Sequence, residues 1–201
     1  MDYIRGTSMH LALFDFDGTI SNRDTTWDFI FRVCGRRRAL NGIIRLIPMS
    51  LAYSLKRIPH HDAKQAVIRH YFGNWEKEAF IEEALRYARD VVPTIIRPEA
   101  LNRINWHQDQ GHTVAVVTGS LDILLSDWCA RLGIDLIATG IDLESTSIGL
   151  STRNCFKEEK ARRIREKYTL ENFECIHAYG DSSGDREMLA LADKRYYKRF
   201  E

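Results

Sequence analysis

The chain has 201 residues, of which 44% are hydrophobic and 28% are charged, and its formal net charge at pH 7 is +1. This composition is that of an ordinary globular protein and excludes a disordered, fibrous or disulfide-stapled chain. A net charge close to zero provides no overall electrostatic field that would attract nucleic acid. We therefore expect no nucleic-acid partner and only local charged sites.

Cysteine usage and hydropathy give expectations about location. The four cysteines are scattered without a Cys-x-x-Cys pair, which predicts reduced thiols, no zinc site and a cytoplasmic protein. Residues 1–8 contain no apolar segment of signal-peptide length. The most apolar run, residues 43–55, contains Arg45 and Pro48 and is shorter than the roughly 20 residues that span a bilayer. We therefore expect neither export nor a transmembrane segment.

Strand and helix patterns alternate along much of the chain. Apolar runs typical of buried strands occupy residues 11–16, 113–117, 134–141 and 175–179, and helical patterns occupy residues 98–110, 121–132 and 157–168. Residues 142–154 have the pattern of a hairpin, and residues 195–200 that of an edge strand. The alternation predicts an α/β fold with a doubly wound parallel sheet, in which ligands bind at the carboxyl ends of the strands.

Residues 22–92 interrupt this alternation, because they hold about four helical patterns and no convincing strand. Pro93 and Pro98 mark the return to the sheet pattern. We therefore divide the chain into a core, residues 1–21 and 93–201, and a helical insert, residues 22–92. The aromatic residues of the insert are expected to pack its interior, as is the apolar run at residues 43–55.

The first predicted strand ends in the sequence Asp15-Phe16-Asp17-Gly18-Thr19. Two carboxylates one residue apart project there from the end of the sheet, and Gly18 permits the tight backbone that they need. One carboxylate can attack an electrophile while the other transfers a proton. The alternative is that the aspartates only cap the next helix.

A second acidic loop, from Gly180 to Asp185, follows the strand at residues 175–179. Carboxylates without His or Cys partners suit Mg²⁺, which prefers an octahedral shell of oxygen atoms. The aspartates of the two loops together therefore imply a hard cation; they are Asp15, Asp17, Asp181 and Asp185. The alternative is a turn in which Asp185 starts a helix. The histidines show no metal-ligand spacing; those considered are His60, His61, His70, His107, His112 and His177.

Thr118-Gly119-Ser120 follows the strand at residues 113–117 and precedes a helix. Hydroxyl and free N–H groups at such a position can bind phosphate oxygens. Lys157 and Lys160 lie in the first turn of the helical pattern at residues 157–168. Taken alone, each lysine is better explained as a solvated surface residue, because the helix dipole disfavours a cation in the first turn.

The order of these motifs resembles the four-part signature of the haloacid dehalogenase-like superfamily: Asp-x-Asp-Gly-Thr, a strand-ending Thr, a Lys, and Gly-Asp-x-x-x-Asp. The resemblance extends over residues 10–193. The insert after the first motif and the sequence Gly-Asp-Ser-Ser-Gly-Asp-Arg-Glu-Met-Leu look like the phosphoserine-phosphatase-like branch, which includes phosphatases of phosphoserine and of phosphatidylglycerophosphate. The resemblance implies a Rossmann-like core with the insert as a helical cap.

The resemblance also implies roles for the acidic residues. Asp15 is the expected nucleophile, which attacks the phosphorus of a phosphomonoester to give an aspartyl-phosphate. Asp17 is expected to protonate the leaving alcohol and then to deprotonate water. Mg²⁺ is expected to bind Asp15, the backbone carbonyl of Asp17 and Asp181, with Asp185 ordering metal-bound water.

The phosphoryl oxygens are expected to bind Thr118, the N–H of Gly119 and Lys160. The usual pattern of the branch favours Lys160, but the spacing also admits Lys157, one helical turn away.

Asp17 separates the types of reaction found in the superfamily. Dehalogenases lack an acid at this position, and transport ATPases carry Thr there, so Asp17 favours a phosphatase. Two alternatives use the same residues: a noncatalytic phosphoacceptor or binding module, and a phosphotransferase that passes the group to an acceptor other than water.

The insert is expected to select the substrate. In phosphoserine phosphatases an acidic residue soon after the nucleophile binds the substrate amino group, and Asp24 stands here where Glu is typical. This departure leaves open both a small amino-alcohol phosphate and a lipid phosphate. Residues 20–75 carry ten basic and three acidic residues, a balance of +7 that could attract an anionic or lipid-surface substrate or simply form a solvated face.

Overall fold

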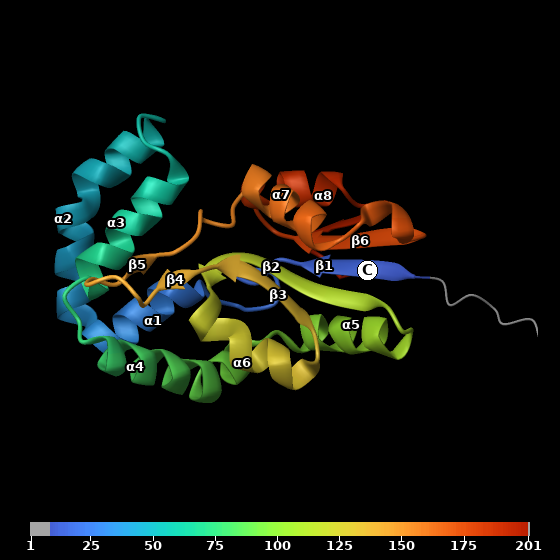
Figure 1. The fold of residues 1–201 in the computed structure, drawn as a ribbon, viewed down its shortest axis with the longest axis horizontal. Helices are drawn as coiled ribbons and strands as arrows, with labels where there is room; N and C mark the ends of the chain where they lie inside the picture. Colours follow the sequence, from blue (N-terminus) through green and yellow to red (C-terminus); the bar gives the residue numbers. More distant parts are fainter. Residues whose placement is uncertain (1–8, 201) are drawn as a thin grey trace, which may run out of the picture.

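The computed structural model describes residues 9–200 (Figure 1). Five parallel strands form the central sheet in the order β3-β2-β1-β6-β7. Their bounds are β1 (His10–Phe14), β2 (Thr113–Leu121), β3 (Asp135–Thr139), β6 (Cys175–Gly180) and β7 (Lys194–Tyr197). The N-terminal segment, residues 1–8, in which no export signal is expected, lies outside the described residues, as does residue 201. The sheet confirms the predicted α/β fold.

Helices cover both faces of the sheet (Figure 1). One face carries α5 (Pro98–Asp109) and α6 (Asp122–Leu132); the other carries α7 (Glu158–Lys167) and α8 (Arg186–Ala190). Because side chains alternate along a strand, Leu11 and Leu13 enter the apolar core beneath α7 and α8. Ala12 and Phe14 enter the core on the opposite face. The sheet therefore has no solvent-facing side along β1.

The predicted boundaries fail where β2 ends. The pairing of β2 with β3 shifts register between Val117 and Leu121, as at a β-bulge. Thr118 and Gly119, expected in a loop, therefore lie in the irregular end of the strand, and α6 begins at Asp122. The strand expected to run to residue 141 ends at Thr139, because the next residues form β4 (Ile141–Asp142). β4 pairs antiparallel with β5 (Gly149–Leu150), which confirms the hairpin.

Four helices follow β1 at the carboxyl end of the sheet (Figure 1). They are α1 (Thr25–Cys34), α2 (Arg36–Ser54), α3 (His60–Phe72) and α4 (Lys77–Asp90). Short 3₁₀ segments lie elsewhere in the chain, at Val92–Ile95, Leu170–Asn172 and Ser183–Asp185. Phe29, Tyr71 and Phe72 are buried in one cluster, as expected for the aromatic residues of the insert. None of the helices in residues 9–200 is long and apolar enough to cross a membrane.

The expectation that residues 43–55 form core holds only in part: Leu46 packs against the core, but several apolar side chains of the same size do not. Ile44, Ile47 and Leu51 are exposed on the outer side of α2. The helix packs through its other side, where Tyr71 Oη donates a hydrogen bond to the carbonyl of Ala39 at 2.6 Å. A Cβ on Gly42 would lie only 2.4 Å from Tyr71 Oη, so the glycine allows α2 this close approach to α3.

Candidate active site

Asp15 is the first residue after β1 and is held by the continuation of the sheet. Its backbone N–H donates to the carbonyl of Tyr179 at 2.9 Å, and its side chain is buried. The turn that follows requires a glycine, because Gly18 has a φ of +83° and a Cβ there would lie 2.6 Å from Asp181 Oδ2. The loop after β1 thereby comes into contact with the loop after β6.

Asp17 is positioned by donors from two other elements. Its Oδ1 accepts the backbone N–H of Thr25 at 3.0 Å, at the start of α1. Its Oδ2 accepts the hydroxyls of Thr25, at 3.3 Å, and of Ser120. The Asp17 carboxylate is therefore fixed between Thr25 at the start of α1 and Ser120 at the end of β2.

The second acidic loop is organised around Asp185. Asp185 Oδ2 accepts the backbone N–H groups of Asp181 at 3.1 Å and Ser182 at 3.0 Å. The Ser182 side chain in turn accepts the N–H of Gly184 at 3.1 Å, forming a capping box. The predicted turn and helix cap is present, and it leaves the second oxygen of Asp185 facing Lys160.

Three of the predicted metal ligands lie together. Asp15, Asp181 and Asp185 each offer a carboxylate oxygen, and the three atoms lie within 4.8 Å of one another. Thr19 Oγ1 donates to Asp181 Oδ1 at 3.3 Å, which steadies the most accessible of the three. The donors are oxygen atoms alone, with no sulfur or imidazole in the group, and this set fits Mg²⁺.

Lys160 is the lysine that reaches these carboxylates. Its Nζ donates to Asp15 Oδ1 at 2.5 Å and to Asp185 Oδ1 at 2.7 Å, and its side chain is 2% exposed. Lys157 precedes α7 with a φ of 52°, and its Nζ lies over the ring of Phe156 instead. Of the two lysines that the sequence left open, the structure therefore brings Lys160 into the acidic cluster.

Thr118 and Gly119 occupy the adjacent strand end. Thr118 Oγ1 accepts the N–H of Ser120 at 3.1 Å, so its own hydrogen remains available for an external acceptor. The carbonyl of Gly119 accepts Thr139 Oγ1 at 2.9 Å and also Lys64 Nζ from α3. Sequence reasoning counted Lys64 only among the basic residues of the insert, because nothing local indicated a contact with residues more than fifty positions away.

Burial and neighbouring charges shift the ionisation of the cluster. Burial raises the pKa of Asp15 to about 7 although Lys160 acts against it, and burial with the charge of Asp24 raises the pKa of Asp17 to about 6. Burial also raises the pKa of Asp181. For Asp185 the effect of burial is outweighed by Lys160, which holds its pKa below the usual value. Crowded carboxylates of this kind favour an additional cation.

Comparison with known proteins places this site in a family. The sequence profile of the haloacid dehalogenase-like hydrolases matches residues 12–190, a range that contains every site residue above. The chain belongs to this family. The hydrolase is 32% identical over 195 residues to protein CicA of Caulobacter vibrioides, covering 94% of this chain and 86% of that protein.

Solved structures share the fold of the hydrolase. A protein of unknown function from Bordetella pertussis Tohama I has a TM-score of 0.76 at 22% identity, with 94% of this chain and 89% of that chain covered. A phosphoserine phosphatase with an analogue of its phospho-aspartyl intermediate has a TM-score of 0.64 at 20% identity, covering 92% and 84% of the two chains. The fold is thus that of the phosphoserine phosphatases.

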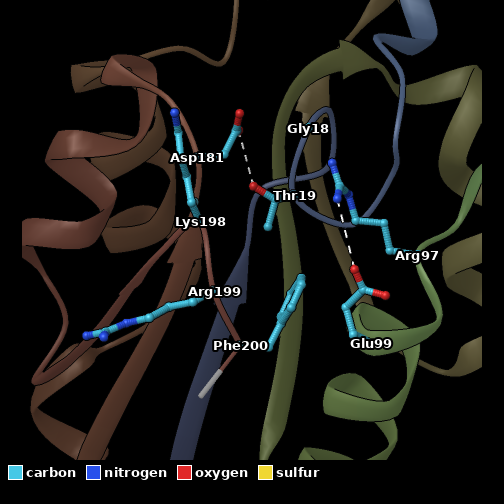
Figure 2. Close-up of a pocket in the computed structure, with 9 residues that line it drawn as sticks. Gly18, Thr19, Arg97, Glu99, Asp181, Lys198, Arg199 and Phe200 are labelled. Atoms are coloured by element: carbon cyan, nitrogen blue, oxygen red, sulfur yellow. Dashed lines mark hydrogen bonds and ion pairs between the residues drawn. The ribbon is translucent and has the colours of Figure 1, made fainter.

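One cavity of the hydrolase borders the acidic cluster, and a second lies within the insert. The larger, about 450 Å³, is lined by Asp181 and Thr19 together with basic residues of the segments after α4 and β7. Figure 2 shows Asp181 beside Thr19, with Arg97 and Lys198 also at this cavity. Because both carboxylates and cations line it, this cavity suits solvent or a polar ligand rather than an apolar group.

The second cavity, about 220 Å³, is lined mainly by the insert, including Met49 and Tyr53 of α2 and Lys64 of α3. Asp24 also lines it, but Asp24 Oδ1 accepts the N–H of Trp27 at 3.0 Å and so caps α1. The predicted recognition role of Asp24 stays a prediction, and this capping gives the residue a structural reason to be there.

Three histidines lie together at the opposite end of the sheet. His10, His112 and His177 have ring nitrogens within 4.8 Å of one another, although the sequence showed no metal-ligand spacing. Neighbouring His107 connects them to Tyr179, with Nδ1 at 2.7 Å from His112 Nδ1 and Nε2 at 2.9 Å from Tyr179 Oη. The grouping joins four separate elements, which explains why spacing along the chain did not reveal it.

The histidine cluster makes the stability of the hydrolase sensitive to acid. Burial and nearby positive charges lower the pKa of His107 to about 3 and that of His177 to about 4. The unfolded imidazoles titrate near about 6.5, so the stabilisation is complete above that pH and is lost as the pH falls toward the folded values. The free energy of unfolding of the wild type should therefore fall between neutral pH and about pH 5. In His177→Gln we expect this fall to be smaller by about 1–2 kcal/mol.

The measurement is urea unfolding of wild type and variant at both pH values. The difference between the two proteins reports on His177 and the neighbouring His107, because the contribution from the raised pKa of Asp15 is common to both. His70→Gln, at an exposed position on α3, serves as the control and should behave as wild type. An identical pH dependence for wild type and His177→Gln would contradict the expectation.

Proposed function

We propose that this hydrolase is a Mg²⁺-dependent phosphatase that hydrolyses a phosphomonoester through an aspartyl-phosphate on Asp15. The observation that carries the proposal is the contact of Lys160 with both Asp15 and Asp185, beside an Asp17 held by Thr25 and Ser120. Bound by Asp15, Asp181 and the backbone carbonyl of Asp17, with Asp185 ordering metal-bound water, Mg²⁺ would offset the negative charge of phosphate and carboxylates.

Asp15 would act as the nucleophile. One of its oxygens accepts a hydrogen bond from Lys160 Nζ at 2.5 Å, which orients the carboxylate at the carboxyl end of β1. An oxygen of Asp15 attacks phosphorus, the new O–P bond forms, and the bond from phosphorus to the ester oxygen breaks. Asp17 donates its proton to the departing alcohol and later takes a proton from the water that hydrolyses the aspartyl-phosphate.

The phosphoryl group would be held by three groups of the chain. Thr118 Oγ1 already accepts a hydrogen bond from Ser120 and keeps its own hydrogen for a phosphoryl oxygen. The N–H of Gly119 and the ammonium of Lys160 supply the other contacts. Burial alone would lower the pKa of Lys160, but the charges of Asp15 and Asp185 keep its pKa raised and the group cationic.

We also propose that the insert, residues 22–92, acts as a cap over the core, residues 1–21 and 93–201. Two contacts between α3 and the core support this proposal. Lys64 Nζ donates to the carbonyl of Gly119, and Gln65 Oε1 accepts the N–H of Leu150 at 2.6 Å. The cavity with Met49 and Tyr53 would receive the alcohol part of the substrate. Its mixed lining accommodates either a small amino-alcohol phosphate or a lipid phosphate.

The test is release of inorganic phosphate by the purified chain from an aryl phosphate. Turnover is expected with Mg²⁺, should fall to background in excess EDTA, and should return when Mg²⁺ is restored, because the three carboxylates alone repel the anionic substrate. EDTA-insensitive turnover would contradict the metal requirement.

The same assay distinguishes the alternatives. A stable phosphoryl group on the protein without released phosphate would indicate a phosphoacceptor, and transfer to an added alcohol in preference to water would indicate a phosphotransferase. A panel of phosphoserine, phosphoethanolamine, sugar phosphates, nucleotides and phosphatidylglycerophosphate then identifies the substrate class from relative kcat/KM.

A further inference from the structure

Helix α2 carries an exposed line of large apolar side chains. Leu40, Ile44, Ile47, Leu51 and Leu55 follow one another at intervals of four or three residues and are each between 51% and 62% exposed. With about 3.6 residues per turn, this spacing places them on a single side of the helix and its C-terminal cap. We name these five residues the apolar stripe.

The direction of the stripe is set by close packing on the other side of α2. Ala39 is buried, its carbonyl accepts the Tyr71 hydroxyl at 2.6 Å, and Gly42 lies against the Tyr71 ring. A rotation of α2 that buried the stripe would break this hydrogen bond and move Gly42 from the ring. In Figure 1, α2 lies at the outer edge of the molecule, away from the sheet.

Positive charge accompanies the stripe at both ends. Residues 29–61 contain seven Arg and Lys residues and no Asp or Glu. Six of these cations are exposed and make no ion pair with any of residues 9–200; they are Arg36, Arg37, Arg38, Arg45, Lys56 and Arg57. The partner of this face therefore has to supply both negative charge and an apolar phase.

We propose that the apolar stripe and its flanking cations dock the protein on the surface of an anionic lipid bilayer. The apolar side chains enter the boundary between headgroups and acyl chains, and the arginines and lysines bind lipid phosphates. α2 contains Arg45 and Pro48 and does not qualify as a membrane span, so it lies in the plane of the surface. A second copy of the chain fits less well, because pairing two such faces brings cations against cations.

Docking through α2 has a consequence for the cavity in the insert. Met49, Ser50 and Tyr53 of the same helix form part of its wall. A docked molecule therefore holds this cavity within about one helix diameter, roughly 10 Å, of the lipid headgroups. The docking itself does not rest on the proposed phosphatase activity, and it can be measured without any substrate.

The experiment is co-sedimentation of the full chain with vesicles of phosphatidylcholine, with and without phosphatidylglycerol. Binding to the anionic vesicles is expected to exceed binding to the neutral ones by at least about tenfold and to weaken as salt is added. The double variant Ile44→Gln with Leu51→Gln should lower binding to the anionic vesicles by about tenfold or more. Leu85→Gln is the matched control, because Leu85 is similarly exposed on α4, outside the stripe.

Three results would overturn the proposal: no binding of wild type to anionic vesicles, equal binding to both vesicle types, or equal losses for the double variant and the control. A dimer in sizing chromatography that the double variant dissociates, without vesicle binding, would assign the stripe to contact between copies instead. Turnover of a soluble aryl phosphate should be the same in wild type and double variant, so failure of docking is distinguishable from failure of the proposed function.

Discussion

Replacing Asp15 with Asn is expected to lower phosphate release by at least about 10³-fold, because an amide oxygen is a far weaker nucleophile than a carboxylate. The substitution keeps the shape of a side chain that is buried beside Lys160. Burial raises the pKa of Asp15, so the anion is unfavourable there and a neutral amide should fold well. The measurement is kcat for an aryl phosphate, with circular dichroism to verify folding.

Asp109→Asn is the matched control, since Asp109 is exposed at the end of α5 and should keep wild-type turnover. Rapid quenching followed by mass measurement adds a second readout. Wild type should carry a transient phosphoryl group during turnover, and Asp15→Asn should carry none. Undiminished turnover by Asp15→Asn would refute the nucleophilic role.

Lys160→Met is expected to abolish detectable turnover and also to destabilise the fold in the absence of Mg²⁺ by about 3–5 kcal/mol. The cation is 2% exposed and bridges Asp15 and Asp185, so its removal leaves two buried carboxylates without compensation. Protonation relieves their repulsion. The destabilisation relative to wild type should therefore be larger at alkaline than at mildly acidic pH, as measured by urea unfolding in EDTA.

Two further variants separate catalysis from stability at this position. Lys157→Met is the control for the lysine one turn away, and it should retain wild-type turnover and stability because Lys157 does not contact the acidic cluster. Combining Lys160→Met with Asp15→Asn removes one of the two carboxylates and should recover much of the lost stability without recovering turnover. Loss of turnover only in Lys157→Met would reverse the assignment of the two lysines.

The candidate site could be predicted to a large extent from local sequence. Asp15 and Asp17, and Asp181 and Asp185, each follow an apolar strand, and parallel strands end at the same edge of a sheet. β1 and β6 pair directly, with Phe14 opposite Tyr179, so the two acidic loops must meet. This part of the prediction needed only the apolar runs of the strands and the position of polar residues after them.

Contacts between distant elements were not predictable in the same way. Lys64 and Gly119 are 55 residues apart, and their contact depends on how α3 rests on the end of β2. The bulge between Val117 and Leu121 likewise follows from the pairing of β2 with β3, for which neither strand alone carries a signal. The histidine cluster around His112 was not predictable for the same reason, because its members come from separate elements.

Local sequence accounts for the alternation of strands and helices, the helical segment after the first strand and the acidic loops, because each depends on the order of neighbouring residues. Two features depend on the tertiary structure: which lysine reaches the carboxylates, and which side of α2 is exposed. Lys160 lies inside α7 and faces the carboxylates, whereas Lys157, one turn earlier, immediately precedes the helix and does not contact them. The packing of Gly42 against Tyr71 turned the apolar side of α2 outward, because helical spacing specifies a face but not what covers it.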